Sequence, residues 1–220
     1  MSQQVITSWS YSRYSTYEQC PFKAKLLYID KFKEPGSPAL ENGVQVHSDI
    51  ERYLKVKDER VPQSAFKLMA HYEELKAQKP YVELEVCFNN KWEPVDWFAK
   101  DAWVRIKIDA LIKEDKAVKI IDHKTGKVRD SYEPQLELYA LTGLLMFPDI
   151  ETVDTALYFV DAGKIIDGQQ YTRADLEMLK ARWTDRVSTM LTDTEFRPTP
   201  NQYCKYCHFR RTNAGICQAA

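Results

Sequence analysis

Two aspartates and a lysine occupy positions from which two predicted strands could bring them together. Asp109 lies within one strand, while Asp122 ends the next strand, two residues before Lys124. Because side chains alternate along a strand, Asp122 and Lys124 face one side of the sheet and His123 faces the other. The strands are joined by a short turn, which favours an antiparallel hairpin. Asp109 would then lie beside Asp122, so that two carboxylates and an ammonium group converge at the end of a sheet.

Cleavage of a phosphodiester bond uses a set of groups of this kind. Mg²⁺ and Mn²⁺ prefer oxygen ligands, which two carboxylates supply while leaving positions for water and phosphate. A nearby lysine can orient or deprotonate the attacking water and neutralise the phosphate. Taken alone, however, an Asp-x-Lys pattern is short enough to recur by chance. The alternative interpretation is an ordinary salt bridge on an edge strand.

Further side chains fall at helical spacings that suit such a centre. His47 follows Gly43 by one helical turn and precedes Glu51 by another. The glycine would let this helix approach a sheet closely, and the histidine could bind a metal. Gln135 and Tyr139 share one face of a later helix, where an amide and a phenol can hold a phosphate or fix a lysine. Each of these residues is also common on helices in which it serves only packing or solubility.

In this order, the motifs resemble those of the RecB-like branch of the PD-(D/E)XK nuclease superfamily. That branch carries Gly-x-x-x-His, then Asp, then (Asp/Glu)-x-Lys and Gln-x-x-x-Tyr, and the segment IIDHKTG at 120–126 is similar to its third motif. The similarity covers nearly the whole chain, from about Ser10 to Cys217. One departure is Lys107, because the family commonly has glycine two residues before the motif aspartate.

The resemblance implies a role for each matching residue. The metal, Mg²⁺ or Mn²⁺, would be bound by His47, Asp109, Asp122 and the backbone carbonyl of His123. Lys124 would be the catalytic lysine, and DNA would be positioned by Gln135 and Tyr139. The similarity also suggests a supporting role for Glu83 or Glu85, and the sequence offers no basis for choosing between them. Glu51, one helical turn after His47, is a further candidate for a supporting role.

Five cysteines are present, and four of them are distributed as metal ligands could be. Cys204 and Cys207 form a Cys-x-x-Cys pair, Cys217 follows, and Cys20 lies near the opposite terminus. Four thiolates can hold zinc or an iron–sulfur cluster, and the spacing does not separate these two. The alternative is a set of unrelated buried or redox-active cysteines. Cys87, in the first predicted strand, is expected to be a packed core thiol.

RecB-like nucleases with iron–sulfur clusters carry one cysteine ahead of the nuclease core and three behind it. In this chain the first stands in YEQCPF at 17–22, and CKYCHFR at 204–210 is similar to their C-terminal segment. The resemblance implies a [4Fe–4S] cluster that joins residues 1–35 and 196–220 into one subregion. The nine residues between Cys207 and Cys217 form a longer gap than is usual there, so Zn²⁺ stays as the alternative.

Hydrophobic periodicity predicts helices and strands in an order typical of an α/β protein. The expected helices are 8–28 (interrupted near Pro21), 40–56, 63–78, 134–146 and 174–192. The expected strands are 82–88, 103–112, 117–123, 154–160 and a short one at 164–171. We therefore expect a single domain over 1–220 with a restriction-endonuclease-like fold, in which helices flank a mixed central sheet.

The composition excludes several classes of protein. A chain of 220 residues that is 44% hydrophobic and 29% charged is typical of a folded globular protein rather than a disordered one. It contains neither an apolar stretch of about 20 residues nor a signal peptide, so we expect no membrane partner and a cytoplasmic location. The net charge of −1 leaves nucleic-acid binding open, because phosphate affinity depends on local patches.

Together these features predict a Mg²⁺- or Mn²⁺-dependent deoxyribonuclease, an exonuclease acting on single-stranded or end-bearing DNA. The sequence contains no Gly-x-x-x-x-Gly-Lys-(Ser/Thr) loop, so a helicase motor is not expected. Besides DNA, the expected partners are a second copy of the chain or proteins of phage recombination, repair or CRISPR adaptation. The competing classes are a non-catalytic DNA-binding or assembly subunit and a structural zinc protein.

Overall fold

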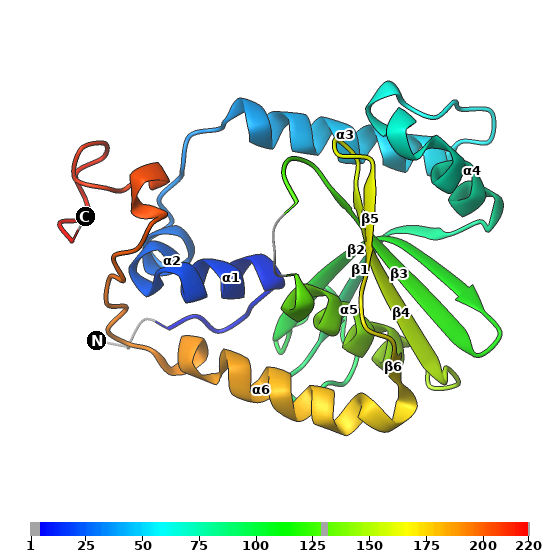
Figure 1. Ribbon diagram of the computed structural model, residues 1–220. Helices are drawn as coiled ribbons and strands as arrows, with labels where there is room; N and C mark the ends of the chain where they lie inside the picture. Colours follow the sequence, from blue (N-terminus) through cyan, green and yellow to red (C-terminus); the bar gives the residue numbers. More distant parts are fainter. Residues whose placement is uncertain (1–4, 129–131, 220) are drawn as a thin grey trace. The chain divides into compact units, whose positions relative to one another are not determined.

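The computed structural model describes residues 5–128 and 132–219, and its elements follow the expected order (Figure 1). The helices are α1 Tyr11–Gln19, α2 Pro21–Tyr28, α3 Pro38–Lys55, α4 Met69–Ala77, α5 Glu133–Met146 and α6 Leu176–Thr192. Short 3₁₀ helices are η1 Gln63–Leu68, η2 Arg173–Asp175 and η3 Cys204–Tyr206. The strands are β1 Tyr81–Phe88, β2 Val104–Glu114, β3 Ala117–Lys124, β4 Thr152–Phe159, β5 Lys164–Asp167 and β6 Tyr171–Thr172.

The chain divides into two compact units. One, the sheet unit, is Ser37–Ala181, and the other, the terminal unit, combines Met1–Gly36 with Arg182–Ala220. The boundary between the units therefore falls within α6. The terminal unit contains both of the segments that were predicted to share the cysteine subregion.

A mixed sheet forms the centre of the sheet unit, as predicted. Its strands pair in the order β1-β2-β3-β4-β5, and β6 also pairs with β4. The β2–β3 hairpin is antiparallel and closes at the pair Glu114↔Ala117, whereas β3 and β4 run parallel. Parallel neighbours need a crossover connection, and α5 supplies it.

Helices cover both faces of this sheet (Figure 1). On one face α3, η1 and α4 bury a hydrophobic cluster against β2, β3 and β4, in which Ile50 and Tyr72 are fully buried. On the other face α5 packs closely, and a Cβ added at Gly143 would lie 3.2 Å from the side chain of Val153 and 3.4 Å from that of Ile120. Because both faces are covered, β3 and β4 read as nearly continuous buried runs.

Several predicted elements differ from the structure in detail. The interruption expected near Pro21 in the helix at 8–28 is confirmed: the segment forms two helices, because Cys20 is extended (φ −166°, ψ 110°) and Pro21 begins α2 at its first position. The helix expected at 63–78 begins as 3₁₀ helix η1, and the strand expected at 164–171 is two short strands, β5 and β6. The 3₁₀ helix lies at the N-terminal end of the predicted helix, where such turns are frequent.

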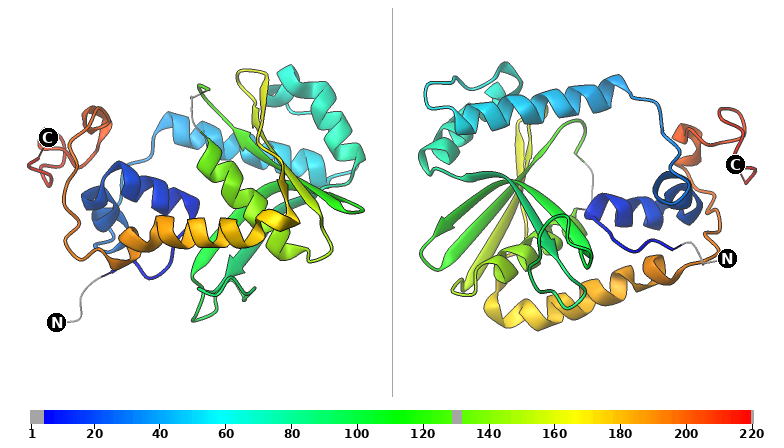
Figure 2. Two further views of the ribbon diagram at one scale, coloured as in Figure 1. Left: turned by 60° about the horizontal axis from the view of Figure 1, so that its bottom comes forward. Right: turned by 180° about the vertical axis from the view of Figure 1, so that it is seen from behind.

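Aromatic side chains and hydrogen bonds hold the N- and C-terminal segments together within the terminal unit. Trp9 stacks on Trp183 with ring centroids 5.5 Å apart. The hydroxyl of Tyr17 donates to Asp193 Oδ2 at 2.8 Å, and Asn201 Nδ2 donates to the carbonyl of Gln19 at 2.8 Å. Figure 2 shows α1, α2 and the C-terminal segment from two further directions. Two segments far apart in sequence therefore share one core.

Candidate active site

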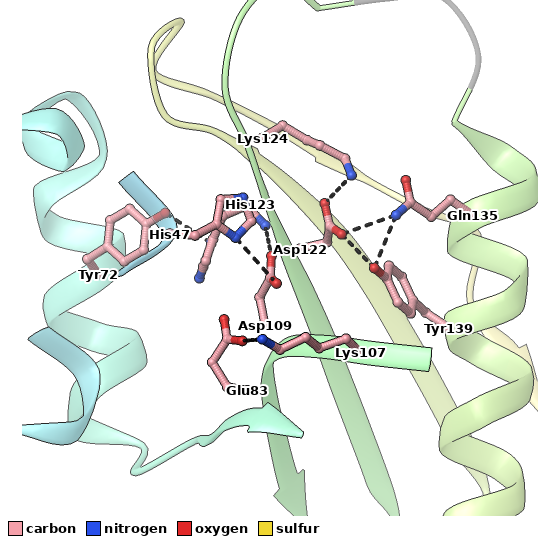
Figure 3. Close-up of polar contacts among 10 residues, drawn as sticks. All are labelled: His47, Tyr72, Glu83, Lys107, Asp109, Asp122, His123, Lys124, Gln135 and Tyr139. Atoms are coloured by element: carbon pink, nitrogen blue, oxygen red, sulfur yellow. Dashed lines mark hydrogen bonds and ion pairs between the residues drawn. The ribbon is translucent and has the colours of Figure 1, made fainter. Parts of the chain in front are cut away.

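Three side chains from three elements of the sheet unit form a compact group of metal-ligating atoms. His47 comes from α3, Glu83 from β1 and Asp109 from β2, and their ligand atoms all lie within 4.8 Å of one another. His47 Nδ1 lies 3.5 Å from Asp109 Oδ1 (Figure 3). An open pocket beside them is lined by these three residues together with Lys107 and Glu51.

Glu83 owes its position to an unusual backbone conformation. Its φ of +57° lies in the left-handed region, which a non-glycine residue seldom adopts within a strand. The regular pairing of β1 with β2 passes from Val82↔Ala110 to Leu84↔Ile108, so the distortion lies opposite Asp109. Backbone strain of this kind is often found at functional sites. Of the two glutamates considered from the sequence, Glu83 lies in the site, and Glu85 is exposed on the same strand.

Lys107 and Glu51 carry further charges at the edge of this group. The ammonium of Lys107 lies 2.5 Å from Glu83 Oε2, and this ion pair raises the pKa of Lys107. Figure 3 shows the lysine reaching the glutamate from the β2 strand. Glu51 lines the pocket one turn beyond His47 and pairs with Lys55 at 2.6 Å. A lysine thus supplies positive charge two residues before Asp109.

Asp122 and Lys124 form an ion pair on the face of the sheet that α5 covers. Lys124 Nζ lies 2.6 Å from Asp122 Oδ2, while the hydroxyl of Tyr139 donates to Asp122 Oδ1 at 2.6 Å. Gln135 Nε2 donates to the same oxygen at 3.2 Å and to the Tyr139 hydroxyl at 3.1 Å. The four residues therefore form one polar network, visible on the right of Figure 3.

His123 links this network to the metal-ligating group. Its backbone N–H donates to Asp109 Oδ2 at 2.7 Å, whereas its ring lies on the opposite face, 3.1 Å from the hydroxyl of Tyr72. Burial lowers the pKa of His123 to about 4, so the ring is neutral near pH 7. Tyr72 on α4 was not found from the sequence, because a tyrosine in a helix carries no signal of a partner so distant along the chain.

The pKa values of the two aspartates are shifted in opposite directions, downward for Asp109 and upward for Asp122. Burial acts to raise the pKa of Asp109, but its hydrogen bond with His47 and the neighbouring histidines hold that pKa below its usual range. The same bond raises the pKa of His47. Burial raises the pKa of Asp122, and the charge of Lys124 opposes this effect. The contact between His47 and Asp109 therefore favours the protonated imidazole and the ionised carboxylate.

The segment that follows Lys124 is held from two sides. The N–H of Val160 donates to the carbonyl of Lys124 at 2.9 Å, and the N–H of Gly126 donates to Asp161 Oδ2 at 2.7 Å. On the helix side, a Cβ added at Gly43 would lie 3.3 Å from Thr125 Oγ1. The glycine before His47 therefore permits the close approach of α3 that its position in the sequence suggested.

Four of the five cysteines line a single pocket in the terminal unit. Cys20 stands between α1 and α2, and Cys204, Cys207 and Cys217 come from the C-terminal segment. All four thiols are free and partly exposed, and the N–H of Asn201 donates to Cys204 Sγ at 3.3 Å. Among the described residues, no three of these sulfurs lie within 4.8 Å of one another. Cys87 is buried in β1 of the sheet unit, and burial raises its pKa.

Comparison with known proteins places this architecture among nucleases. A family model described as the PD-(D/E)XK nuclease superfamily matches residues 8–212. A solved structure from Eubacterium rectale, called a "putative exonuclease", has a TM-score of 0.54 and 16% identity, covering 93% of this chain and 88% of that one. At this identity the likeness is one of fold alone.

A second solved structure, of a protein called SSO0001, has a TM-score of 0.35 and 18% identity, covering 80% of this chain and 95% of that one. That TM-score is too low to support an argument. No curated protein sequence gives a significant match. Among the described residues, no helix has the length and apolar character needed to cross a membrane.

Proposed function

Because the chain belongs to the PD-(D/E)XK nuclease superfamily, we propose that it is a metal-dependent deoxyribonuclease of the RecB-like branch. Its substrate is single-stranded or end-bearing DNA, from which it removes nucleotides as an exonuclease. The observation that carries this proposal is the convergence of two sets of groups. The ligand atoms of His47, Glu83 and Asp109 lie within 4.8 Å of one another, and the Asp122–Lys124 ion pair is joined to them through His123.

The donor set suits a divalent cation. Two carboxylates supply the oxygen ligands that Mg²⁺ and Mn²⁺ prefer, and the His47 imidazole adds a nitrogen ligand. The contact with His47 holds the pKa of Asp109 below its usual range, which favours the ionised carboxylate that a cation would need. The residues that would hold the metal are His47, Glu83 and Asp109, with Asp122 and the carbonyl of His123 completing the set. A bound cation would neutralise charge on the scissile phosphate and help to ionise the attacking water.

The remaining groups act on the substrate and on its water. Lys124, whose ammonium is paired with Asp122, orients the attacking water and neutralises charge that develops on the phosphate. Tyr139 and Gln135 hold the Asp122 carboxylate through two hydrogen bonds, which fixes the direction of the lysine. The Oε1 atom of Gln135, which takes no part in these two hydrogen bonds, would contact DNA.

Cleavage assays on labelled DNA test the proposal. Linear single strands, linear duplexes and circular single strands would be incubated with Mg²⁺, Mn²⁺ or EDTA. We expect linear single strands to be degraded with either metal and circles to resist, because an exonuclease needs an end. Asp109→Asn, Asp122→Asn and Lys124→Met should each lower the rate by roughly 100-fold or more.

Asp154→Asn provides a matched control. Asp154 lies on the neighbouring strand β4, where its partner is Gln170, so this variant should cut at the wild-type rate. An inactive wild type that still binds DNA would show a non-catalytic binding subunit. Normal cutting by the Asp122 and Lys124 variants would show that the active site lies elsewhere.

We propose further that Cys20, Cys204, Cys207 and Cys217 hold a [4Fe–4S] cluster. Their shared pocket supports this proposal, because four thiols from both ends of the chain line one space. Thiolates are the ligands of such clusters and also of structural zinc. The cluster would join the N- and C-terminal segments covalently, adding to the aromatic contacts that already hold them together.

Metal analysis of protein purified without oxygen tests this second proposal. A cluster would give a brown solution that absorbs at about 400 nm and contains about four irons per chain. Cys20→Ser and Cys204→Ser should lose the iron and melt at a lower temperature, whereas the control Cys87→Ser should retain it. A colourless protein that contains one zinc per chain would show that the cysteines form a zinc site and not a cluster. Wild-type metal content in both serine variants would exclude either kind of site.

A further inference from the structure

The net charge of the whole chain conceals a strong separation of charge between its two units. The terminal unit, residues 1–36 and 182–220, contains 11 lysines and arginines but only 6 aspartates and glutamates, which gives +5. Because the whole chain carries −1, the sheet unit carries −6. The unit with the acidic candidate active site therefore repels a polyanion on average, and affinity for DNA must be supplied mainly by another surface.

The C-terminal segment concentrates this positive charge. Residues 196–220 contain four lysines and arginines and no aspartate or glutamate. Arg197 pairs with Glu195, but within the described part of the chain Lys205, Arg210 and Arg211 form no ion pair with a carboxylate. Instead, Arg210 Nη1 donates to the carbonyl of Lys205 at 2.6 Å, which holds these two cations close together.

Two more cations join them from the N-terminal segment. Phe32 packs on Phe209 with ring centroids 6.2 Å apart, so the chain neighbours of these rings are brought together. Lys31 and Lys33 flank Phe32, and both are exposed and have no carboxylate partner among the described residues. Arg210 follows Phe209 directly. The terminal unit therefore brings five cations without acidic partners to one region.

An exposed tyrosine lies among these cations. Tyr206 is 76% exposed, and the ammonium of Lys205 lies 4.9 Å from the centre of its ring. Surfaces that bind single-stranded nucleic acid combine cations for the phosphates with aromatic rings on which unpaired bases stack. A duplex offers the same phosphates, but its bases are already stacked and cannot use the ring.

We infer that this surface, the basic patch formed by Lys31, Lys33, Lys205, Tyr206, Arg210 and Arg211, binds single-stranded DNA. The patch belongs to the terminal unit and shares no residue with the metal-ligating group of the sheet unit. The inference rests on the proposed function, because a nuclease is what gives the patch a DNA strand to hold. The patch binds phosphates through its cations and one base through Tyr206, so that it retains the strand independently of sequence.

Binding measured in EDTA separates this inference from catalysis. The probe is a fluorescently labelled dT₂₀ oligonucleotide, followed by anisotropy at several salt concentrations. The test variant combines Lys31→Gln, Lys33→Gln and Arg211→Gln, whose side chains are exposed and make no hydrogen bond in the described structure. The matched control removes three exposed lysines of the sheet unit by Lys57→Gln, Lys91→Gln and Lys100→Gln.

We expect the test variant to bind dT₂₀ roughly tenfold to a hundredfold more weakly at 0.1 M salt, because it lacks three cations that contact phosphates. Each phosphate contact in a single strand contributes about 0.7 to the slope of log affinity against log salt concentration. The magnitude of that slope should fall by about 2, whereas the control should keep it. Tyr206→Ala should weaken dT₂₀ binding at least about fivefold and leave duplex binding nearly unchanged. Tyr206→Phe keeps the aromatic ring and should bind dT₂₀ as tightly as the wild type.

Two results would overturn the inference. One is an affinity and a salt slope equal to those of the wild type in the test variant. This result would show that the patch does not bind DNA, and an acidic protein would then be the partner that its charge suits. The other is an equal loss in the control, which would make the effect one of total charge. Since no cleavage occurs in EDTA, a protein that binds through the patch but never cuts DNA would refute the proposed function and leave this inference intact.

Discussion

Tyr139→Phe tests the contribution of the hydrogen-bonded network around Asp122 to stability. The substitution removes only the hydroxyl that donates to Asp122 Oδ1 at 2.6 Å in a buried environment. A hydrogen bond to a charged group contributes about 1.5–3 kcal/mol, and its loss leaves the carboxylate with Gln135 and Lys124 as partners. In a chain of this size, each kcal/mol corresponds to a melting shift of roughly 2–4 °C. We therefore expect the melting temperature to fall by about 3–12 °C.

The assay is thermal unfolding in EDTA at several pH values, with Tyr158→Phe as the control. Tyr158 is also buried in the sheet unit, but its hydroxyl makes no hydrogen bond within the described structure, so its removal should cost little. Lys124→Met with and without Tyr139→Phe would then show whether the two partners of Asp122 act together.

The pH dependence of this variant has a defined sign. Burial raises the pKa of Asp122 in the folded protein, so its ionisation costs stability as pH rises from the unfolded value of about 3.9 through the folded one. The Tyr139 hydroxyl lowers that pKa by bonding to the ionised form. Its loss should therefore cost more at pH 8 than at pH 4. An unchanged melting temperature, or a deficit no larger than that of Tyr158→Phe, would refute the assignment.

Three further predictions concern other parts of the chain. Lys107→Gln removes the ion pair with Glu83, so Mn²⁺ measured by calorimetry should bind about threefold to tenfold more tightly; weaker binding would mean that the lysine orients the glutamate instead. Gly168→Ala should destabilise the protein by about 1–3 kcal/mol in thermal unfolding, because the new Cβ would lie 2.3 Å from Thr155 Oγ1, and wild-type melting would contradict this contact. Partial burial acts to raise the pKa of Asp193, but hydrogen bonds to the ionised carboxylate outweigh this effect and hold the pKa below its usual value. The ionised Asp193 therefore stabilises the fold above about pH 4, and this stabilisation is lost as the pH falls through the pKa of the folded state. Asp193→Asn should accordingly melt lower at pH 7, with a difference that shrinks toward pH 3; a constant difference would point to packing.

Local sequence determined the parts of the site that lie within one element or one hairpin. The alternation of side chains in β3 places Asp122 and Lys124 on one face and His123 on the other, and the structure has them so. The helical spacing of Gln135 and Tyr139 likewise brings both to the same Asp122 oxygen. Strand and helix periods are fixed by backbone geometry, so these relations follow from residue order alone.

Only the tertiary structure decided which residues from different elements meet. Nothing in the sequence separates Glu83 from Glu85, because the choice depends on a left-handed residue in β1 opposite Asp109. The contact of Tyr72 with His123, and the charge separation that gives the terminal unit its basic patch, depend equally on long-range packing. The reason is physical. Burial of distant segments against one another fixes such pairs, and no local period encodes them.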